Sequence, residues 1–269
     1  MGHFYREIAG QAAPFYEVPK ANGEMRGVHV GDARKTDAVP SPNTVMGIHA
    51  KPGLIWWSDD LLMDAATAVW ATEYDGDWKT RARDLHKEYK EVKANQGTEI
   101  HEEIEDAEKH FMEDSIIPFA TYKWGPQVEA AINWLLTDEE NGGGYINIEA
   151  VEKYFVNREL GLGGMIDIVG TGNGRPVIVD WKTVDLKPNG DFKNTYPKDK
   201  LPLLAAYAMG NYGTLDVDCW NNFIARDPSA KLKAVRYDDD EILWGWEKFQ
   251  HCYELWVMEK NFDPRGNNG

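Results

Sequence analysis

The sequence predicts an α/β (α+β) domain in which helices precede a central mixed sheet and further helices pack on that sheet. Two observations support this fold class. Before the glycine run at 142–144, capping residues precede segments whose apolar side chains have helical spacing. After that run, the spacing becomes that of β-strands. A hydrophobic share of 42% and 11 tryptophans also indicate a folded chain.

The N-terminal half is expected to be mostly helical. Residues 1–39 are interrupted by glycine and proline, which predicts an irregular arm or short extended pieces. A single domain should cover 40–262, mainly helical over 40–140, with the sheet and its helices over 145–262 and a tail over 263–269. Helices are predicted after the cap residue Ser41, after Ser58-Asp59-Asp60, over 78–94 as an exposed charged helix, from Gly97, and over 128–136.

The second half predicts a sheet with helices. Strand candidates at 146–156, 161–169 and 177–183 favour an antiparallel meander. A helix should begin at Asp199, with Pro202 in its first turn, where proline is tolerated. Further strands are expected at 219–225 and 231–237, and the aspartates at 238–240 cap a last helix that ends near residue 260.

The segment from Gly163 to Thr183 places charged residues on strands that should be buried. Gly172-Asn173-Gly174 predicts a turn, and a symmetric hairpin around it sets Asp167 opposite Asp180, with Cβ atoms roughly 5 Å apart. Strand alternation puts Lys182 on the same face as Asp180. Because Asp and Lys are rarely buried unless they are paired or bind something, this face is a candidate functional site.

Two interpretations fit this charged face. Adjacent carboxylates repel each other unless a cation lies between them or one is protonated, and carboxylate oxygens are ligands that Mg²⁺ and Mn²⁺ prefer. Alternatively, Lys182 neutralises Asp180 in a structural salt bridge, and Asp167 lies near a solvated strand end. The spacing is compatible with both.

Composition excludes some classes of protein. The formal charge of −16 argues against broad electrostatic binding to nucleic acid or anionic membrane, so a nucleic-acid enzyme would need local basic patches and metal ions. The two cysteines, Cys219 and Cys252, are too few for a cysteine-rich zinc site or an iron–sulfur cluster. Because neither a secretory signal nor a membrane-spanning apolar run is present, we expect a cytoplasmic protein with no membrane partner.

Five motifs occur in the order found in a known nuclease family. They are PSPNT at 40–44, GTEIH at 97–101, GMIDIV at 164–169, IVDWKT at 178–183 and LLAAYA at 203–208. Together they resemble the PD-(D/E)XK nuclease superfamily in its RecB-like branch. The chain is also similar to phage-type exonucleases and to the mitochondrial genome maintenance exonuclease. The resemblance covers residues 40–260 and implies a restriction-endonuclease-like core.

The resemblance also implies roles for individual residues. Asp167 and Asp180 would bind metal, Lys182 would be the catalytic lysine, and His101 would be a further metal ligand. The backbone carbonyl of Trp181 is expected to complete the coordination. Secondary candidates are Tyr207, Glu152, Glu105 and Ser41.

Two positions have competing explanations. The family commonly has a glutamine four residues before the helix tyrosine, where this chain has Leu203, so the family's substrate contacts through that helix are in question here. His101 can instead be a helix-face histidine paired with Glu105 one turn later. The iron–sulfur cluster of some relatives is not expected.

These inferences predict a deoxyribonuclease that uses one or two Mg²⁺ or Mn²⁺ ions. The resemblance implies an exonuclease acting on phosphodiester bonds at free DNA ends, in the host cytosol if a phage encodes it. Single-stranded DNA is the expected substrate, because a strongly acidic chain holds a stiff duplex poorly. A single-strand annealing or binding protein is a candidate partner.

Three alternatives remain open at this point. The chain can be a duplex-end exonuclease of a phage recombination system. It can be a catalytically inactive nuclease-fold protein that binds DNA. It can also be an unrelated metal-dependent hydrolase of small phosphoesters.

Overall fold

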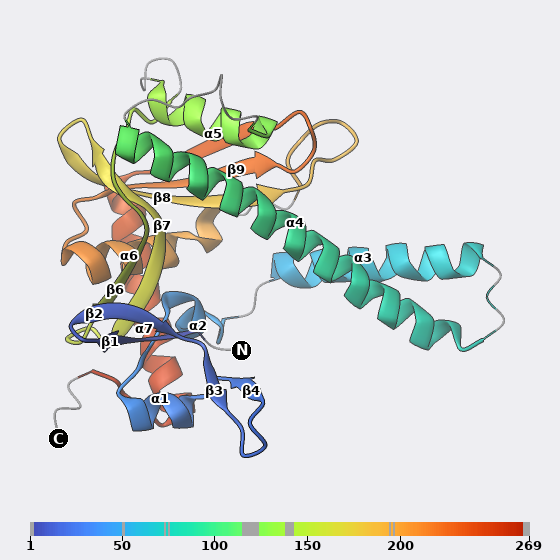
Figure 1. Cartoon of the computed structure of the whole chain (residues 1–269), viewed down its shortest axis with the longest axis horizontal. Coiled ribbons are helices and arrows are strands. Elements are labelled where there is room, and N and C mark those ends of the chain that lie inside the picture. The colour runs from blue at the N-terminus through green and yellow to red at the C-terminus, as the bar shows by residue number, and fades with distance from the viewer. Residues whose placement is uncertain are drawn as a thin grey trace.

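The computed structural model describes residues 3–49, 52–72, 74, 76–114, 124–137, 143–193, 195 and 197–265. At its centre is a five-stranded mixed sheet with helices on both faces (Figure 1). The predicted mixed α and β fold class is therefore confirmed. Gly142 of the predicted helix break and residues 266–269 of the predicted tail lie outside the described residues.

The sheet has the spatial order β10-β9-β8-β7-β6. Its members are β6 (Asn147–Asn157), β7 (Leu162–Gly172), β8 (Arg175–Val184), β9 (Asp218–Ala225) and β10 (Leu232–Tyr237). The strands β6, β7 and β8 form the predicted antiparallel meander, and β10 pairs antiparallel with β9. β8 and β9 are parallel, so a crossover must join them, and α6 (Leu201–Tyr212) lies in that connection.

Helices cover the two faces of the sheet by burying opposite sides of the same strands. Val179 and Trp181 of β8 pack with α4 (Trp78–Asp114) and α5 (Pro126–Leu136). Ile178, directly before Val179 in the chain, packs with α6 on the other face, and α7 (Asp239–Lys260) lies against α6. Two helix starts lie at or close to their predicted positions. Pro202 is in the first turn of α6, and Asp238 caps α7, although α6 begins two residues later than expected, after a 3₁₀ turn (η2, Pro197–Asp199).

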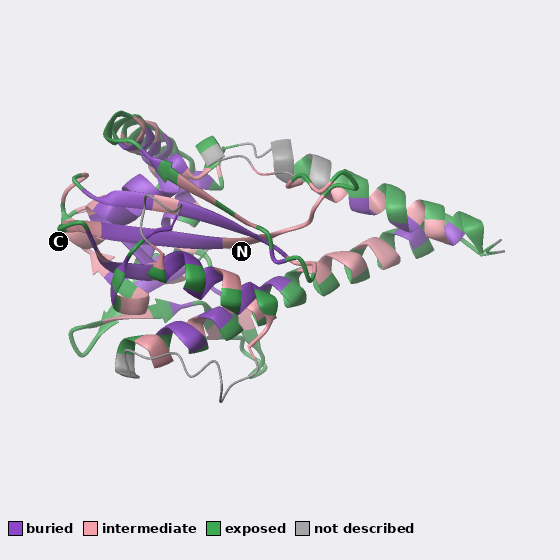
Figure 2. Cartoon of the chain, turned by 90° about the horizontal axis from the view of Figure 1, so that it is seen from above, coloured by how far each residue is buried: buried purple, intermediate pink, exposed green. Residues whose placement is uncertain are grey.

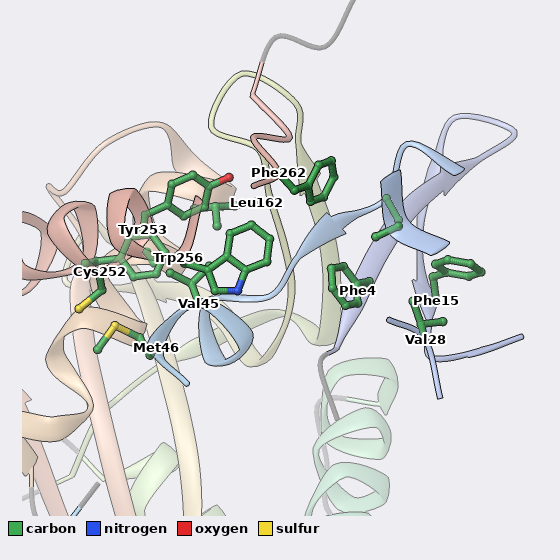
Figure 3. Close-up of a cluster of buried hydrophobic side chains, with 14 residues drawn as sticks. Phe4, Phe15, Val28, Val45, Met46, Leu162, Cys252, Tyr253, Trp256 and Phe262 are labelled. Atoms are coloured by element: carbon green, nitrogen blue, oxygen red, sulfur yellow. The ribbon is translucent and has the colours of Figure 1, made fainter. Parts of the chain in front are cut away.

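The described part of the first 39 residues is folded rather than irregular. Its elements are β1 (Phe4–Ile8), β2 (Gln11–Phe15), β3 (Glu17–Pro19), β4 (Met25–Gly27), α1 (Val30–Thr36) and β5 (Val39–Pro40). Strands β2, β1 and β5 form a small sheet in that order, next to α2 (Pro42–Met46). Phe4 and Phe15 from this sheet share a buried cluster with Trp256 of α7 (Figure 3). Strands this short carry little periodicity of their own, and tertiary packing stabilises them.

A helical hairpin projects from the body of the molecule (Figures 1 and 2). It consists of α3 (Pro52–Ala71) and residues 78–96 of α4, and is called the arm below. The described side chains of 78–94 are mostly exposed, as expected. Two boundaries differ from the prediction. Ser58-Asp59-Asp60 lies inside α3 and therefore caps no helix. The two helices predicted at 78–94 and from Gly97 are one continuous helix, because a single interior glycine disfavours a helix by only about 1 kcal/mol.

Cys219 and Cys252 are both buried and carry free thiols. Among the described helices, none has the combination of length and apolar character that a bilayer crossing requires.

Candidate active site

The candidate site lies where the β7–β8 hairpin opens. Asn173 and Gly174 have φ values of 49° and 79°, which a tight Asn-Gly turn requires. The register runs from Gly172 opposite Arg175 to Ile168 opposite Val179, so the predicted pair of Asp167 and Asp180 comes directly after the last paired residues. The β7–β8 pairing ends at Ile168; from there β7 stays with β6 and β8 stays with β9. We call this opening the fork.

At the fork, the side chain of Asp167 provides a hydrogen bond where the β7–β8 backbone pairing has ended. Its Oδ2 accepts a hydrogen bond of 2.8 Å from the backbone N–H of Trp181, which has left the β7–β8 pairing. Burial raises the pKa of the Asp167 carboxyl; the Asp180 carboxylate adds to the rise, while Lys182 opposes it. The two predicted aspartates are therefore electrostatically coupled neighbours.

Lys182 binds Asp180 directly and acts on Asp167 through its charge. Its Nζ donates to Asp180 Oδ1 at 2.8 Å and to the Trp181 carbonyl at 2.7 Å. Burial of the amine lowers its pKa, but the Asp180 and Asp167 carboxylates outweigh that effect, so the pKa of Lys182 is raised. Asp180 is only 5% exposed, and its Oδ2 has no hydrogen-bond partner among the described residues. One oxygen of this carboxylate thus remains available to a further ligand.

Helix α4 brings His101 to the same place. Gly97, one turn earlier, lets the helix approach the sheet, since a Cβ there would lie 3.0 Å from Thr183 Oγ1 of β8. Burial lowers the pKa of His101 to about 4; Lys182 lowers it as well, and the Asp180 carboxylate opposes the change. The imidazole is therefore neutral at pH 7, the form in which histidine binds metals.

Glu105, one turn after His101, belongs to the same helix face. It pairs with Lys109 on its own helix, and the described ion pairs do not join it to His101. On β6, Glu152 stands opposite Asp167 in the register and has a left-handed φ of 48°. Burial raises the pKa of Glu152, and Glu105 raises it further, through its charge and a shared hydrogen bond. Both secondary candidates therefore border the Asp167–Asp180 pair.

Glu108 is a site residue that the sequence analysis missed. It is 1% exposed, and its Oε1 accepts a 2.8 Å hydrogen bond from the indole Nε1 of Trp181. Burial raises its pKa well above the usual range, and Asp167 adds to that effect. The signal was present in the sequence: residues 101, 105 and 108 share one face of a helix, so a carboxylate seven residues after His101 points to the same side.

Tyr207 approaches the fork from α6, which covers the face of the sheet opposite to that covered by α4. Its side chain is buried, and burial holds the pKa of the phenol well above the usual value, with Asp180 and Asp167 adding to the rise. The close approach depends on Gly164, where a Cβ would lie 2.9 Å from the Tyr207 ring. Leu203, at the position of the family glutamine, is buried in the core below α6.

Ser41 takes no described part in this cluster. Its Oγ accepts a hydrogen bond from the Thr44 N–H at 3.0 Å and caps α2. Thr44 Oγ1 in turn binds the backbone of His3, accepting from its N–H and donating to its carbonyl. The segment that matched the PSPNT motif therefore fixes the N-terminal strand.

The donor set of the fork suits a hard divalent cation. It offers carboxylate oxygens, including the unpartnered Asp180 Oδ2, and a neutral imidazole. Within the described residues, no three His, Cys, Asp or Glu side chains are already grouped closely enough to hold a metal ion. Instead, Lys182 Nζ occupies Asp180 Oδ1 and the Trp181 carbonyl, two of the expected ligand atoms.

No protein-family model matches this chain, and a comparison with curated proteins also found no match.

Proposed function

We propose that the protein is a metal-dependent deoxyribonuclease with a restriction-endonuclease-like core. The observation that carries this proposal is the fork, where the charges of Asp180 and Lys182 act on the buried Asp167 and one buried Asp180 oxygen has no partner among the described residues. A purely structural salt bridge explains Lys182 and Asp180 Oδ1. It leaves unexplained why the chain gathers Asp167, Glu108 and Glu152 around the same point, where their charges repel each other.

Asp167, Asp180 and His101 are the residues that would hold Mg²⁺ or Mn²⁺, with Glu108 and Glu152 in support. When bound, such an ion neutralises charge on a scissile phosphate and lowers the pKa of a water molecule. Lys182 must shift from the Trp181 carbonyl if that oxygen is to become a ligand. Metal binding therefore competes with the ion pair seen in the protein alone.

Lys182 is better suited to act as a cation than as a base. Because the neighbouring carboxylates raise its pKa, the amine stays protonated near neutral pH. An ammonium at this position can orient the attacking water or donate a hydrogen bond to a phosphate oxygen whose charge increases in the transition state. Trp181 aligns this group, since its backbone N–H binds Asp167 and its carbonyl accepts from Lys182.

We further propose exonuclease action on single-stranded DNA ends. Residues 97–114 of α4 lie across the sheet next to the fork, while the arm projects away from the body (Figure 1). A strand entering beside α4 would pass His101 before it reached Asp180. A single-strand annealing or binding protein is the partner class that such an enzyme would meet.

The direct test uses end-labelled linear DNA, single- and double-stranded, incubated with Mg²⁺ or Mn²⁺ and sized over time. A covalently closed circular single strand of the same sequence is the control for the need for an end. Progressive shortening of the linear single strand, with the circle intact, supports the proposal. Rapid cutting of the circle would make the protein an endonuclease, and preferred digestion of duplex ends would favour the recombination-type alternative.

One observation favours a second candidate, a nuclease-fold protein that binds DNA without cutting it. The described residues do not already form a metal site, and Lys182 pairs with the carboxylate that would bind the ion. Calorimetric titration with Mn²⁺ separates the two: measurable binding favours the enzyme, and DNA binding without metal binding or cleavage favours the second candidate.

A further inference from the structure

Three tyrosines form a cluster next to the fork. Tyr5 lies on β1, Tyr16 follows β2, and Tyr154 lies on β6; together they are called the tyrosine platform. The Tyr5 ring is 5.7 Å from that of Tyr16 and 6.2 Å from that of Tyr154, measured between centroids. Tyr5 is buried, whereas Tyr16 and Tyr154 are each 36% exposed. The platform therefore offers aromatic surface to solvent.

The exposed rings are held in place from beneath. The hydroxyls of Tyr5 and Tyr16 are hydrogen-bonded at 2.7 Å, and the ring of His3 lies 4.8 Å from that of Tyr16. The strand carrying Tyr5 is fixed at its start by the two hydrogen bonds between Thr44 and the His3 backbone. A Cβ at Gly163 would lie 2.6 Å from the Cβ of Tyr5, so this glycine permits the close approach of β1 to β7.

The platform is continuous with the candidate site, because Tyr154 lies two residues after Glu152 on β6 and its register partner on β7, Met165, lies two residues before Asp167. Burial raises the pKa of the Tyr154 phenol, and the nearby Glu152 carboxylate raises it further. Burial likewise raises the pKa of Tyr16; its hydrogen bond to Tyr5 opposes the rise and Glu152 adds to it. Both phenols are therefore uncharged at neutral pH. Uncharged aromatic rings thus border a cluster of carboxylates at the point where β6 and β7 meet.

We propose that the tyrosine platform stacks against nucleobases of a single strand whose phosphate lies at the fork, an inference that rests on the proposed function for its substrate class. Carboxylates repel phosphate, so affinity beside them has to come from a contact that needs no charge. Base stacking on aromatic rings provides it and accepts any base. Bases within a duplex already cover each other's faces, so the platform selects single strands or opened ends.

The test measures binding of two labelled oligonucleotides by fluorescence anisotropy, in a buffer that contains Ca²⁺. One is an oligothymidylate, and the other is an abasic oligonucleotide of the same length. The abasic strand keeps the phosphates and lacks the bases. Tyr16→Ala and Tyr154→Ala are expected to weaken oligothymidylate binding by about 5- to 150-fold each, the range found for lost base stacking, with little change for the abasic strand. Tyr16→Phe keeps the ring and should bind nearly as tightly as wild type.

Tyr145→Ala is the matched control, because Tyr145 is 61% exposed and its backbone lies next to the β7–β8 turn at Gly172. Circular dichroism checks that each variant is folded. If Tyr16→Ala does not fold, Tyr154→Ala provides the test. Equal binding of the two oligonucleotides by wild type, or an equal effect of Tyr145→Ala, overturns the inference. If wild type cuts DNA but the platform variants bind normally, the platform fails and the proposed function stands. If the platform variants lose oligothymidylate binding but no metal supports cleavage by wild type, the platform inference stands and the proposed nuclease function fails.

Discussion

The two ends of the β7–β8 hairpin use the same pair of strands in different ways. At the turn end, the register from Ile168–Val179 to Gly172–Arg175 is complete, and Ile178 between these pairs is fully buried. At the fork, the pairing stops, and the carboxylate of Asp167 takes the hydrogen bond that a backbone carbonyl would otherwise accept. At the turn end, the buried carboxylate of Asp218 is matched by Arg175 and Arg236, whereas at the fork several carboxylates lie near a single lysine, Lys182.

This difference shows why the charges lie at the fork. Buried backbone N–H and C=O groups that no longer pair with a neighbouring strand need other hydrogen-bond partners. Side chains can be these partners only if their polar atoms point into the protein. Burial of these inward-pointing carboxylates raises the pKa of Asp167 and Glu108, and the charges of neighbouring carboxylates add to the rise. We therefore expect substitutions at the fork to affect chemistry and substitutions at the turn end to affect stability.

The largest expected effect is that of Asp180→Asn at the fork. Losing the carboxylate that we propose as a metal ligand should reduce DNA cleavage by more than about 100-fold and weaken Mn²⁺ binding measured by calorimetry. Asp218→Asn is the matched control, because Asp218 is equally buried, at 5%, and pairs with Arg175 and Arg236 at the turn end. Unchanged Mn²⁺ affinity in Asp180→Asn would refute the metal site.

The next effect concerns the turn end. Ile178→Ala removes a fully buried side chain and should lower the free energy of unfolding by about 2–5 kcal/mol, measured in urea. Activity of the molecules that remain folded should stay close to wild type. If a fully folded Ile178→Ala protein lost cleavage, the proposed separation between the two ends would be wrong.

His101→Gln should reduce cleavage by about 10- to 100-fold and weaken metal binding, because one ligand is lost from a small set. His110→Gln, on the same helix next to Asp106, is the control and should leave activity unchanged. Near-wild-type activity in His101→Gln would mean that this histidine only packs against its own helix.

His101 also predicts a pH effect on stability. Its pKa is about 4 in the folded protein and near the ordinary 6.5 in the unfolded chain, so the unfolded chain takes up the proton first. The stability that this group contributes is present above pH 6.5 and is lost as the pH falls towards 4. Urea unfolding at pH 7 and pH 5 should therefore show a smaller loss for His101→Gln than for wild type. An equal loss would contradict the assigned burial.

The smallest effect is expected for Glu108→Gln. The amide oxygen can still accept from Trp181 Nε1, so the network should persist. Because burial raises the pKa of Glu108, wild type loses this group's contribution to stability as the pH rises through the folded pKa, and the glutamine variant should not. Urea unfolding at neutral pH should show Glu108→Gln at least as stable as wild type. Glu108→Leu, which lacks an acceptor, is the contrasting variant and should be less stable.

The hairpin was predictable because its information is local. Asn173-Gly174 fixes the turn, and the turn fixes the register as far as Ile168 opposite Val179, directly before Asp167 and Asp180. Other features depended on distant contacts. Strand β1 pairs with β5 some 35 residues later, and neither is long enough to show a pattern.

The site was predictable in part for the same reason. Asp180 and Lys182 were visible through strand alternation, and His101 through its motif. Glu108 was hidden by a stretch so rich in acidic residues that a buried carboxylate looked like an exposed one. Its burial is set by Trp181, which lies 73 positions later in the chain. Ser58-Asp59-Asp60 led to a wrong prediction of a helix start, because residues that favour helix caps are also tolerated inside a helix that tertiary contacts stabilise.

The continuous helix α4 has a mechanical consequence. Its 37 residues extend for about 55 Å, with the arm at one end and His101, Glu105 and Glu108 towards the other. An unbroken α-helix is stiff, so a tilt imposed on the arm by a bound strand or protein turns the whole rod. Ile104 and Ala107 hold the other end of this rod in the core against the sheet. The arm and the imidazole of His101 thus belong to one stiff element that is anchored at the end next to the fork.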